Sequence, residues 1–419
     1  EARNLFETVL AKEPWNREAL LGLADLEYRR GRYAEGLSFA DQVLRLDAYD
    51  PKGNFIAGNL YRALGQTVDA REAFGWSARS IGFRAVSYVQ MAELALVDGD
   101  YVEADRYARL AKDYDRNSLS ANRLLAVLAR LGGDGAEWDR ILSSILELDP
   151  LHHFAEAELY LAGVSTEEEF VEGFRSEYPE QELLELAIDY VELSRREDAI
   201  ALLELSEIAL GHAMLGVWRA YLTEDTAVLA DGVDPDFVFP YRPESILTLE
   251  WATASDSHWS WAYLLGLNLW ARDRVAEAAE LFIGLDEIPD YGPFYVSRAL
   301  MASQFEGGGL VSQVDLESDF RRAVELAPDL RAVHVSLIQY LHREGRWEDA
   351  LSVSADARHR FPEDFDLDLL HAVALNETLR FEASIKLLDE IEVLPSENSS
   401  VSHQIFAEAH MLAGLDALD

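Results

Sequence analysis

The sequence predicts an all-α fold, a solenoid of stacked antiparallel helix pairs, and three observations lead to this prediction. Glycines recur every 34 residues in the first part of the chain, at positions 31, 65, 99 and 133. Small residues stand at fixed distances before and after these glycines. No sustained run alternates apolar and polar residues as a β-sheet requires. A repeat of about this length is typical of stacked helical hairpins.

Residues 1–150 carry the most regular part of this pattern. Each repeated glycine follows one apolar helical stretch and precedes another, so it suits a turn in which φ is positive. A small residue seven positions earlier lets the two helices approach closely, and these residues are Ala24, Gly58, Ala92 and Ala126. A second small position follows five residues after the glycine, at Gly36, Ala70 and Ala104, with Trp138 as the exception.

These spacings resemble the tetratricopeptide repeat (TPR), a 34-residue hairpin with small residues at its eighth and twentieth positions. Residues 18–46 match best, with the sequence EALLGLADLEYRRGRYAEGLSFADQVLRL. The resemblance implies a right-handed superhelical solenoid. Ala2, Phe6 and Pro14 fit the second helix of a repeat whose first helix is absent. The sequence therefore also predicts that it is a fragment of a larger protein, beginning in mid-repeat.

Residues 151–250 are expected to hold degenerate helical repeats and an irregular connector. Ala187 and Ala199 keep the twelve-residue spacing of the two small positions. Further on, prolines at 235, 240 and 243 exclude a continuous helix. We expect an extended segment from Asp236 to Tyr241, with the next helix starting near Pro243 or Glu244.

Residues 251–419 are expected to form a second TPR-like array. Gly266 and Ala278 fit the two small positions, and Gly345 with Ala350 fit an interhelical turn and the helix after it. Ile338 occupies a place where the repeat prefers a small residue. Three glycines, 307–309, predict a longer interhelical loop. Residues 402–415 predict one more helix.

The connector carries a narrower resemblance. The segments PDFVFPYRPESILTLEWA and WAYLLGLNLWARDRVAEAAELF, followed by GPFYVSRALM, are similar to the C-terminal TPR tail of bacterial multidomain proteins of unassigned function. In those proteins the tail follows an N-terminal region of mutarotase-like β-sandwich character. The resemblance implies a bacterial protein and a carbohydrate context.

The charge of the chain disfavours two classes of partner. With 36 basic and 77 acidic residues, its net charge is −41. A phosphate backbone or an anionic membrane surface would be repelled, so we expect neither nucleic acid nor membrane insertion. The acidity agrees with simple solubility or with attraction of a basic partner. The sequence contains no cysteine, which excludes disulfides and thiolate zinc sites but leaves the compartment open, cytoplasmic or exported.

No catalytic motif is present in the sequence, and we predict no catalytic residues, no cofactor and no metal site. A nucleophile elbow, a P-loop and a dinucleotide-binding glycine motif are all missing. His152, His153 and Glu156 lie close together, but a metal needs three or four ligands with a supporting shell. The alternative for these residues is an ordinary helix start after Pro150.

The best binding candidates lie on the first helix of each repeat, which lines the concave face of a TPR solenoid. The repeat phase places Tyr28, Lys52, Phe55, Asn59 and Arg62 there. Such a groove commonly takes an extended peptide. In TPRs that clamp a carboxylate, a lysine stands where this chain has Phe55, so that clamp is incomplete.

Three further candidates come from the connector and the segment after it. Tyr241 and Arg242 lie on the connector, where a loop held by a rigid scaffold can carry function. In the alternative, Phe237, Phe239 and Tyr241 anchor the connector in the core. Trp251 opens an aromatic group with Trp259, Trp261, Tyr263 and Trp270, which suits either stacking on a ligand or packing between repeats.

The sequence thus favours a protein-interaction or scaffolding module. Its partner would be a protein or peptide, or an upstream domain of the same protein. The main alternative is the helical tail of a carbohydrate-active enzyme, bordering a sugar-binding site. In that case Tyr241, Arg242 or the tryptophan group would face outward together. A third possibility, a homo-oligomeric scaffold, leaves the oligomeric state open.

Overall fold

The computed structural model describes residues 2–174, 176–205, 212–304, 314–391 and 399–416. These residues form 24 α-helices and one 3-10 helix, and they contain no β-strand. The predicted all-α class is therefore confirmed. The chain divides into two compact units, Glu1–Arg274 and Val275–Asp419. The triple glycine at 307–309 lies outside the described residues. Within them, no helix combines the length and the apolar character needed to cross a membrane.

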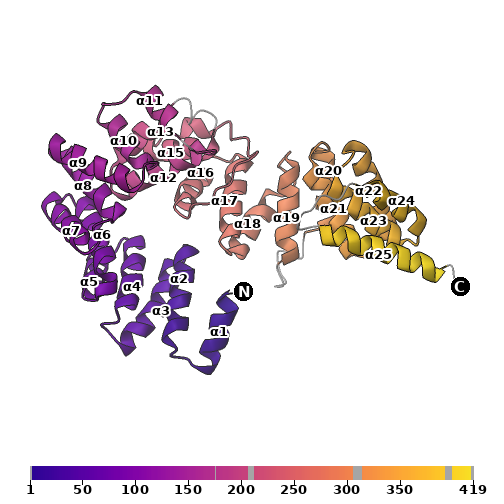
Figure 1. Cartoon of the computed structure of the whole chain (residues 1–419), viewed down its shortest axis with the longest axis horizontal. Coiled ribbons are helices and arrows are strands. Elements are labelled where there is room, and N and C mark those ends of the chain that lie inside the picture. The colour runs from indigo at the N-terminus through magenta and orange to yellow at the C-terminus, as the bar shows by residue number, and fades with distance from the viewer. Residues whose placement is uncertain (1, 175, 206–211, 305–313, 392–398, 417–419) are drawn as a thin grey trace. The chain divides into compact units, whose positions relative to one another are not determined.

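Unit 1 consists of helical hairpins that follow one another along the chain (Figure 1). Its helices are α1 (Ala2–Lys12), α2 (Arg17–Arg29), α3 (Tyr33–Leu46), α4 (Pro51–Ala63), α5 (Thr67–Ser77), α6 (Ile81–Val97), α7 (Tyr101–Tyr114), α8 (Leu119–Gly132), α9 (Gly135–Leu148), α10 (His153–Leu161), α11 (Glu167–Gly173), α12 (Pro179–Glu192), α13 (Arg196–Leu203), α15 (Ala213–Thr223), η1 (Thr226–Leu229), α16 (Ser245–Ser255) and α17 (Trp259–Ala271).

Unit 2 repeats the same hairpin arrangement. Its helices are α18 (Val275–Leu285), α19 (Gly292–Gln304), α20 (Leu316–Leu326), α21 (Arg331–Arg343), α22 (Trp347–Arg360), α23 (Phe365–Glu377), α24 (Phe381–Glu390) and α25 (Ser399–Asp416). Phe320, Leu337, Leu341 and Ala350 belong to one of its buried clusters. Ile338 is fully buried too, so a large residue is accommodated where the repeat prefers a small one.

Local sequence signals set the helix starts in the regular hairpins. Asn16 accepts a hydrogen bond from the Ala19 amide at 3.0 Å and so caps α2. Asp50 does the same for α4 through the Gly53 amide at 2.6 Å, and Pro51 occupies the first turn. These caps satisfy backbone donors that have no partner inside the helix. Asp100, Ser118 and Asp134 cap α7, α8 and α9 in the same way.

The repeated glycines occupy the turns for which they were predicted. Gly31, Gly65, Gly99 and Gly133 all have φ between 71° and 74°, a conformation that side chains disfavour. The small positions are also where neighbouring helices approach closely. At Gly58, for example, a Cβ would lie 2.6 Å from the Phe74 ring, so a larger residue would clash.

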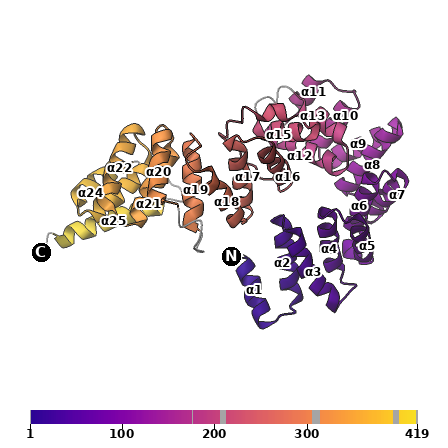
Figure 2. The same ribbon diagram turned by 180° about the vertical axis from the view of Figure 1, so that it is seen from behind.

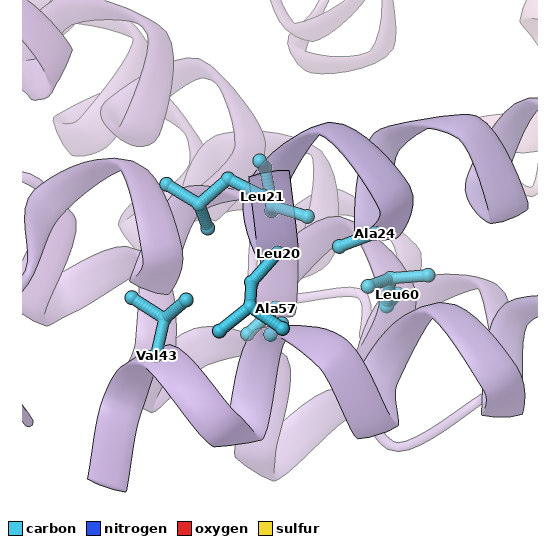
Figure 3. Close-up of a cluster of buried hydrophobic side chains, with 8 residues drawn as sticks. Leu20, Leu21, Ala24, Val43, Ala57 and Leu60 are labelled. Atoms are coloured by element: carbon cyan, nitrogen blue, oxygen red, sulfur yellow. The ribbon is translucent and has the colours of Figure 1, made fainter. Parts of the chain in front are cut away.

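The space between hairpins is filled by aliphatic side chains. Figure 3 shows such a cluster, in which Leu20, Leu21 and Ala24 of α2 pack with Val43 of α3 and with Ala57 and Leu60 of α4. In the first half of unit 1, α2 contacts α4, α4 contacts α6, and α6 contacts α8. The first helices of successive hairpins therefore form one continuous layer, as in a TPR solenoid.

The connector after η1 differs from its prediction in one respect. Asp236 and Phe237 form a turn, closed by a hydrogen bond from the Val238 amide to the Pro235 carbonyl at 3.1 Å. Phe237 has a φ of 59°, so the segment 236–241 is not extended throughout. Phe237 and Phe239 are 88% and 68% exposed, whereas Val238 between them is buried. The two phenylalanines therefore do not anchor the connector in the core. Helix α16 begins at Ser245, next to its predicted start.

Unit 1 curves until its far end touches its beginning (Figure 2 gives the reverse view). Arg272, just after α17, donates a hydrogen bond to the Arg29 carbonyl at 2.8 Å, across 243 residues of sequence. Arg30 forms an ion pair with Asp273 beside this bond. The turn between α2 and α3 is thus fastened to the end of α17, and the face lined by α2, α4 and α6 becomes the inside of a closed arrangement.

Candidate functional site

A pocket of about 500 Å³ lies on this inner face of unit 1. Helices α2, α4 and α6, together with the start of α3, form one side of it, and α12 with the residue preceding α16 forms the other. Its volume lies within the range of small-ligand and side-chain pockets. Its lining residues are Tyr28, Tyr33, Phe55, Asn59, Arg62, Ala63, Gln90, Glu93, Glu192 and Glu244.

Arg62 stands at the centre of the polar lining. Its guanidinium forms an ion pair with Glu93 and a second one with Glu192 at 3.3 Å. It also donates to the Gln90 side-chain oxygen at 2.7 Å, and Gln90 in turn donates to Glu93 at 3.0 Å. Arg62 and its neighbours therefore join α4 and α6 to α12.

The connector is held against α12 by one carboxylate. Glu185 accepts a hydrogen bond from the Tyr241 hydroxyl at 2.6 Å and forms an ion pair with Arg242 at 2.9 Å. Arg242 Nε also lies 2.9 Å from Glu244 Oε2. These contacts fix the approach to α16 and place the Glu244 side chain at the pocket.

Helix α17 supports the same segment from behind. Asn268 donates to the Arg242 carbonyl at 2.8 Å, and Arg272 donates to the Tyr241 carbonyl. Since Arg272 also bonds the Arg29 carbonyl, one side chain joins the connector to the turn after α2. Both walls of the pocket therefore depend on the closure of unit 1.

The ionisation of the pocket follows from its burial. Burial raises the pKa of the Glu192 carboxyl; Arg62 opposes this rise, while Glu93 and Glu244 add to it. Burial, with smaller effects of Tyr33 and Glu192, raises the pKa of the Tyr28 hydroxyl to about 12. Tyr28 is consequently a neutral hydroxyl at physiological pH. Its ring lies 5.7 Å from the Tyr33 ring, between centroids.

Asn59 is a polar lining residue whose side chain is still available to a ligand. It is half-buried on α4, and within the described part of the chain its side chain makes no hydrogen bond. A side-chain amide offers two donors and an acceptor, which suits a peptide backbone. Phe55 lies nearby with its ring 5.8 Å from Phe74 and 5.6 Å from Phe83.

Several residues predicted as binding candidates meet at this pocket and others do not. Tyr28, Asn59 and Arg62 line it, and Tyr241 and Arg242 lie one layer behind it, next to Glu244. Lys52 lies at the first turn of α4 and forms an ion pair with Glu18 at 3.5 Å, away from the pocket lining. Trp251 packs against Tyr221 with ring centroids 5.6 Å apart.

The aromatic group after the connector does not form one outward face. Trp261 is only 1% exposed and donates its indole N–H to the Leu229 carbonyl at 3.2 Å. Tyr263 is also buried. At the start of α10, His152 caps the helix by accepting from the Phe154 amide at 3.3 Å. Over the residues described, no three histidine, aspartate or glutamate side chains are grouped to hold a metal.

Sequence reasoning missed five polar or aromatic lining residues: Tyr33, Gln90, Glu93, Glu192 and Glu244. A signal existed for Glu93, because it follows Asn59 by one period of 34 residues. No comparable signal points to Glu192 or Glu244, which come from the irregular part of the chain and reach the pocket only through its closure.

Comparison with known sequences and structures supports the repeat type. Residues 1–51 match the sequence model of the family described as tetratricopeptide repeat. No curated protein matches the chain.

Solved structures with similar hairpins share little sequence with this chain. The TPR protein YrrB, whose structure is described as having an unusual peptide-binding site, is 16% identical, with a TM-score of 0.32, over 50% of this chain and 94% of its own. The P58(IPK) TPR domain is 14% identical, with a TM-score of 0.25, over 96% of this chain and 99% of its own. The structure of the APC/C hetero-tetramer Cut9–Hcn1 is 13% identical, with a TM-score of 0.33, over 97% of this chain and 92% of its own. At such low TM-scores these structures support no functional argument.

Proposed function

We propose that this chain, whose N-terminal hairpins match tetratricopeptide repeats, is a protein-interaction module that binds an extended segment of a partner in the pocket of unit 1. The partner segment belongs either to another protein or to another part of the same polypeptide. The observation that carries this proposal is the pocket itself, with aromatic walls and the uncommitted amide of Asn59.

The pocket has the features that peptide recognition needs. It is concave and lined by the first helices of three consecutive hairpins, which is where helical repeats bind extended chains. Its aromatic side chains supply contact area with little loss of rotamer freedom. The charged residues around it are fixed by one another, so the binding surface is already ordered before the partner arrives.

Selection of peptides from a random display library on the purified chain tests this function. We expect related peptides to be enriched and their binding to be abolished by Asn59→Trp, which would fill the pocket. Asn59→Ala should weaken binding by about three- to tenfold, since it removes one hydrogen bond. Fluorescence anisotropy with a labelled selected peptide measures both effects.

Asn117→Trp is the matched control, because Asn117 is an exposed residue of the turn between α7 and α8. It should leave binding unchanged, and circular dichroism should show equal helix content in all variants. Enriched peptides that bind Asn59→Trp as well as the original chain would disprove the proposal, as would the absence of any enriched peptide.

The alternative is a helical tail that borders a sugar-binding site. The exposed faces of Phe237 and Phe239 favour it, because aromatic rings can stack on sugars. The burial of Trp261 and Tyr263 removes the larger outward aromatic face that this alternative needs. Binding of soluble oligosaccharides that is lost on Phe237→Ala but kept on Asn59→Trp would favour this alternative over peptide recognition.

A further inference from the structure

The pocket of unit 1 carries more negative than positive charge. Among its lining residues, Arg62 is opposed by three carboxylates, those of Glu93, Glu192 and Glu244. Glu93 and Glu192 already pair with Arg62, so the positive charge of that guanidinium is balanced before a ligand arrives. A negatively charged ligand group would therefore meet an arginine that is already paired and an excess of carboxylates.

Glu244 shares its arginine partner with a second carboxylate. Its Oε2 atom is buried and accepts no hydrogen bond from any described residue, although Arg242 Nε lies 2.9 Å away. Arg242 is shared with Glu185, whose carboxylate lies equally close at 2.9 Å. Arg242 therefore divides its charge between two carboxylates, so the negative charge at this edge of the pocket would stabilise an incoming cation.

Glu192 shows the same shortage of positive charge. Among the residues that the structure describes, its ion-pair partner is Arg62, which it shares with Glu93. The raised pKa of Glu192 agrees with this shortage, because burial and the two neighbouring carboxylates disfavour its charged form. A cation in the pocket would relieve this repulsion.

The apolar walls suit the same ligand. Tyr28, Tyr33 and Phe55 line the pocket, and the pair of tyrosine rings stands 5.7 Å apart between centroids. Aromatic faces attract ammonium and guanidinium groups, and they also pack along the methylene stem of a long basic side chain. Tyr28 and Tyr33 carry hydroxyls that can accept from such a group.

We infer that the pocket binds a lysine or arginine side chain of the partner segment, with Glu192 and Glu244 as its counter-ions and the tyrosine rings along its stem. This inference rests on the proposed peptide-binding function and assigns its specificity. The overall charge of −41 would assist the approach of such a basic segment. The recognised group is the opposite of the peptide carboxylate that a clamp-type TPR would hold.

The peptides enriched from the random library provide the test. We expect them to share a lysine or arginine at one aligned position. Replacing that residue by norleucine or citrulline should weaken binding at least tenfold in fluorescence anisotropy, and so should Glu244→Gln combined with Glu192→Gln in the chain. Glu250→Gln is the matched control, since Glu250 is an exposed glutamate of α16 outside the pocket.

The possible outcomes separate this inference from the function on which it rests. If the enriched peptides do not bind the Asn59→Trp variant but share no lysine or arginine, the peptide-binding function is supported and the cation inference is wrong. The enriched peptides could instead share a cation and yet bind the Glu250→Gln variant as weakly as the double variant. Their attraction would then come from the overall negative charge of the chain, and the assignment of the cation to the pocket would be wrong. If no enriched peptide depends on the pocket, both proposals fail. Thermal unfolding confirms that the double variant is folded before it is scored.

Discussion

Helices α2–α9 and helices α10–α17 both build hairpins in unit 1, but their turns and interiors are made differently. In the first set, glycine occupies every αL turn and small residues bring the helices together. In the second set, Ser194 and Asp273 adopt the αL conformation, seven residues after Ala187 and Gly266. The repeated half supplies a uniform wall, whereas the irregular half supplies the individual side chains, Glu185, Glu192 and Glu244, that shape the pocket.

The junction between the two halves is held by a buried polar network. Glu158 of α10 is completely buried and accepts from Arg130 at 2.8 and 3.0 Å, from Trp138 at 3.1 Å and from Tyr190 at 2.6 Å. Trp138 is the residue that breaks the small-residue rule, and its indole N–H has a specific partner here. A large residue is thus accommodated because the next hairpin provides an acceptor for it.

The largest expected effect comes from breaking this junction. Glu158→Ala removes the carboxylate that accepts from Arg130, Trp138 and Tyr190. The Arg130 guanidinium then lacks this partner. We expect the free energy of unfolding to fall by about 3–5 kcal/mol, as for other buried ion pairs that lose one member. Urea denaturation followed by circular dichroism measures this. Glu147→Ala, at an exposed position of α9, serves as the control, and an equal loss in both variants would contradict the role of the network.

A smaller effect is expected from the close packing of the repeated half. Gly58→Ala places a methyl group 2.6 Å from the Phe74 ring and should destabilise the chain by about 1–3 kcal/mol. Gly75→Ala, in the next helix and with open space around it, should instead stabilise by up to about 1 kcal/mol. The difference between the two denaturation midpoints gives the comparison. Equal effects would mean that close approach at Gly58 is unimportant.

The smallest effect concerns the turns, which can be exchanged between the halves. Ser194→Gly relieves a serine held at a φ of 56° and should stabilise by about 0.5 kcal/mol. Gly65→Ser imposes the same strain on a turn whose φ is 71° and should destabilise by about 1 kcal/mol. Thermal denaturation of the two variants checks both signs. If Ser194→Gly did not stabilise the chain, the serine turn of the irregular half would carry no energetic cost.

Periodic features of the fold could be predicted from the sequence, because each depends on contacts that recur every 34 residues. The αL turns at Gly31 to Gly133 and the place of Tyr28, Asn59 and Arg62 on one inner face follow from that period. Glu192 and Glu244 could not be placed, because they reach the pocket through single contacts such as Arg272 to the Arg29 carbonyl. Such contacts join residues far apart in sequence and leave no periodic trace.

The contact between Arg272 and Arg29 also has a mechanical consequence. A helical solenoid whose ends are free responds to tension like a spring, since small rotations at every hairpin interface add up along its length. In unit 1 the two ends are joined, so tension between them falls first on the Arg272 hydrogen bonds and on the Arg30–Asp273 pair. While these hold, the hairpins cannot extend together. The stiffness of the inner surface therefore depends on these polar contacts as well as on the apolar contacts between the repeats.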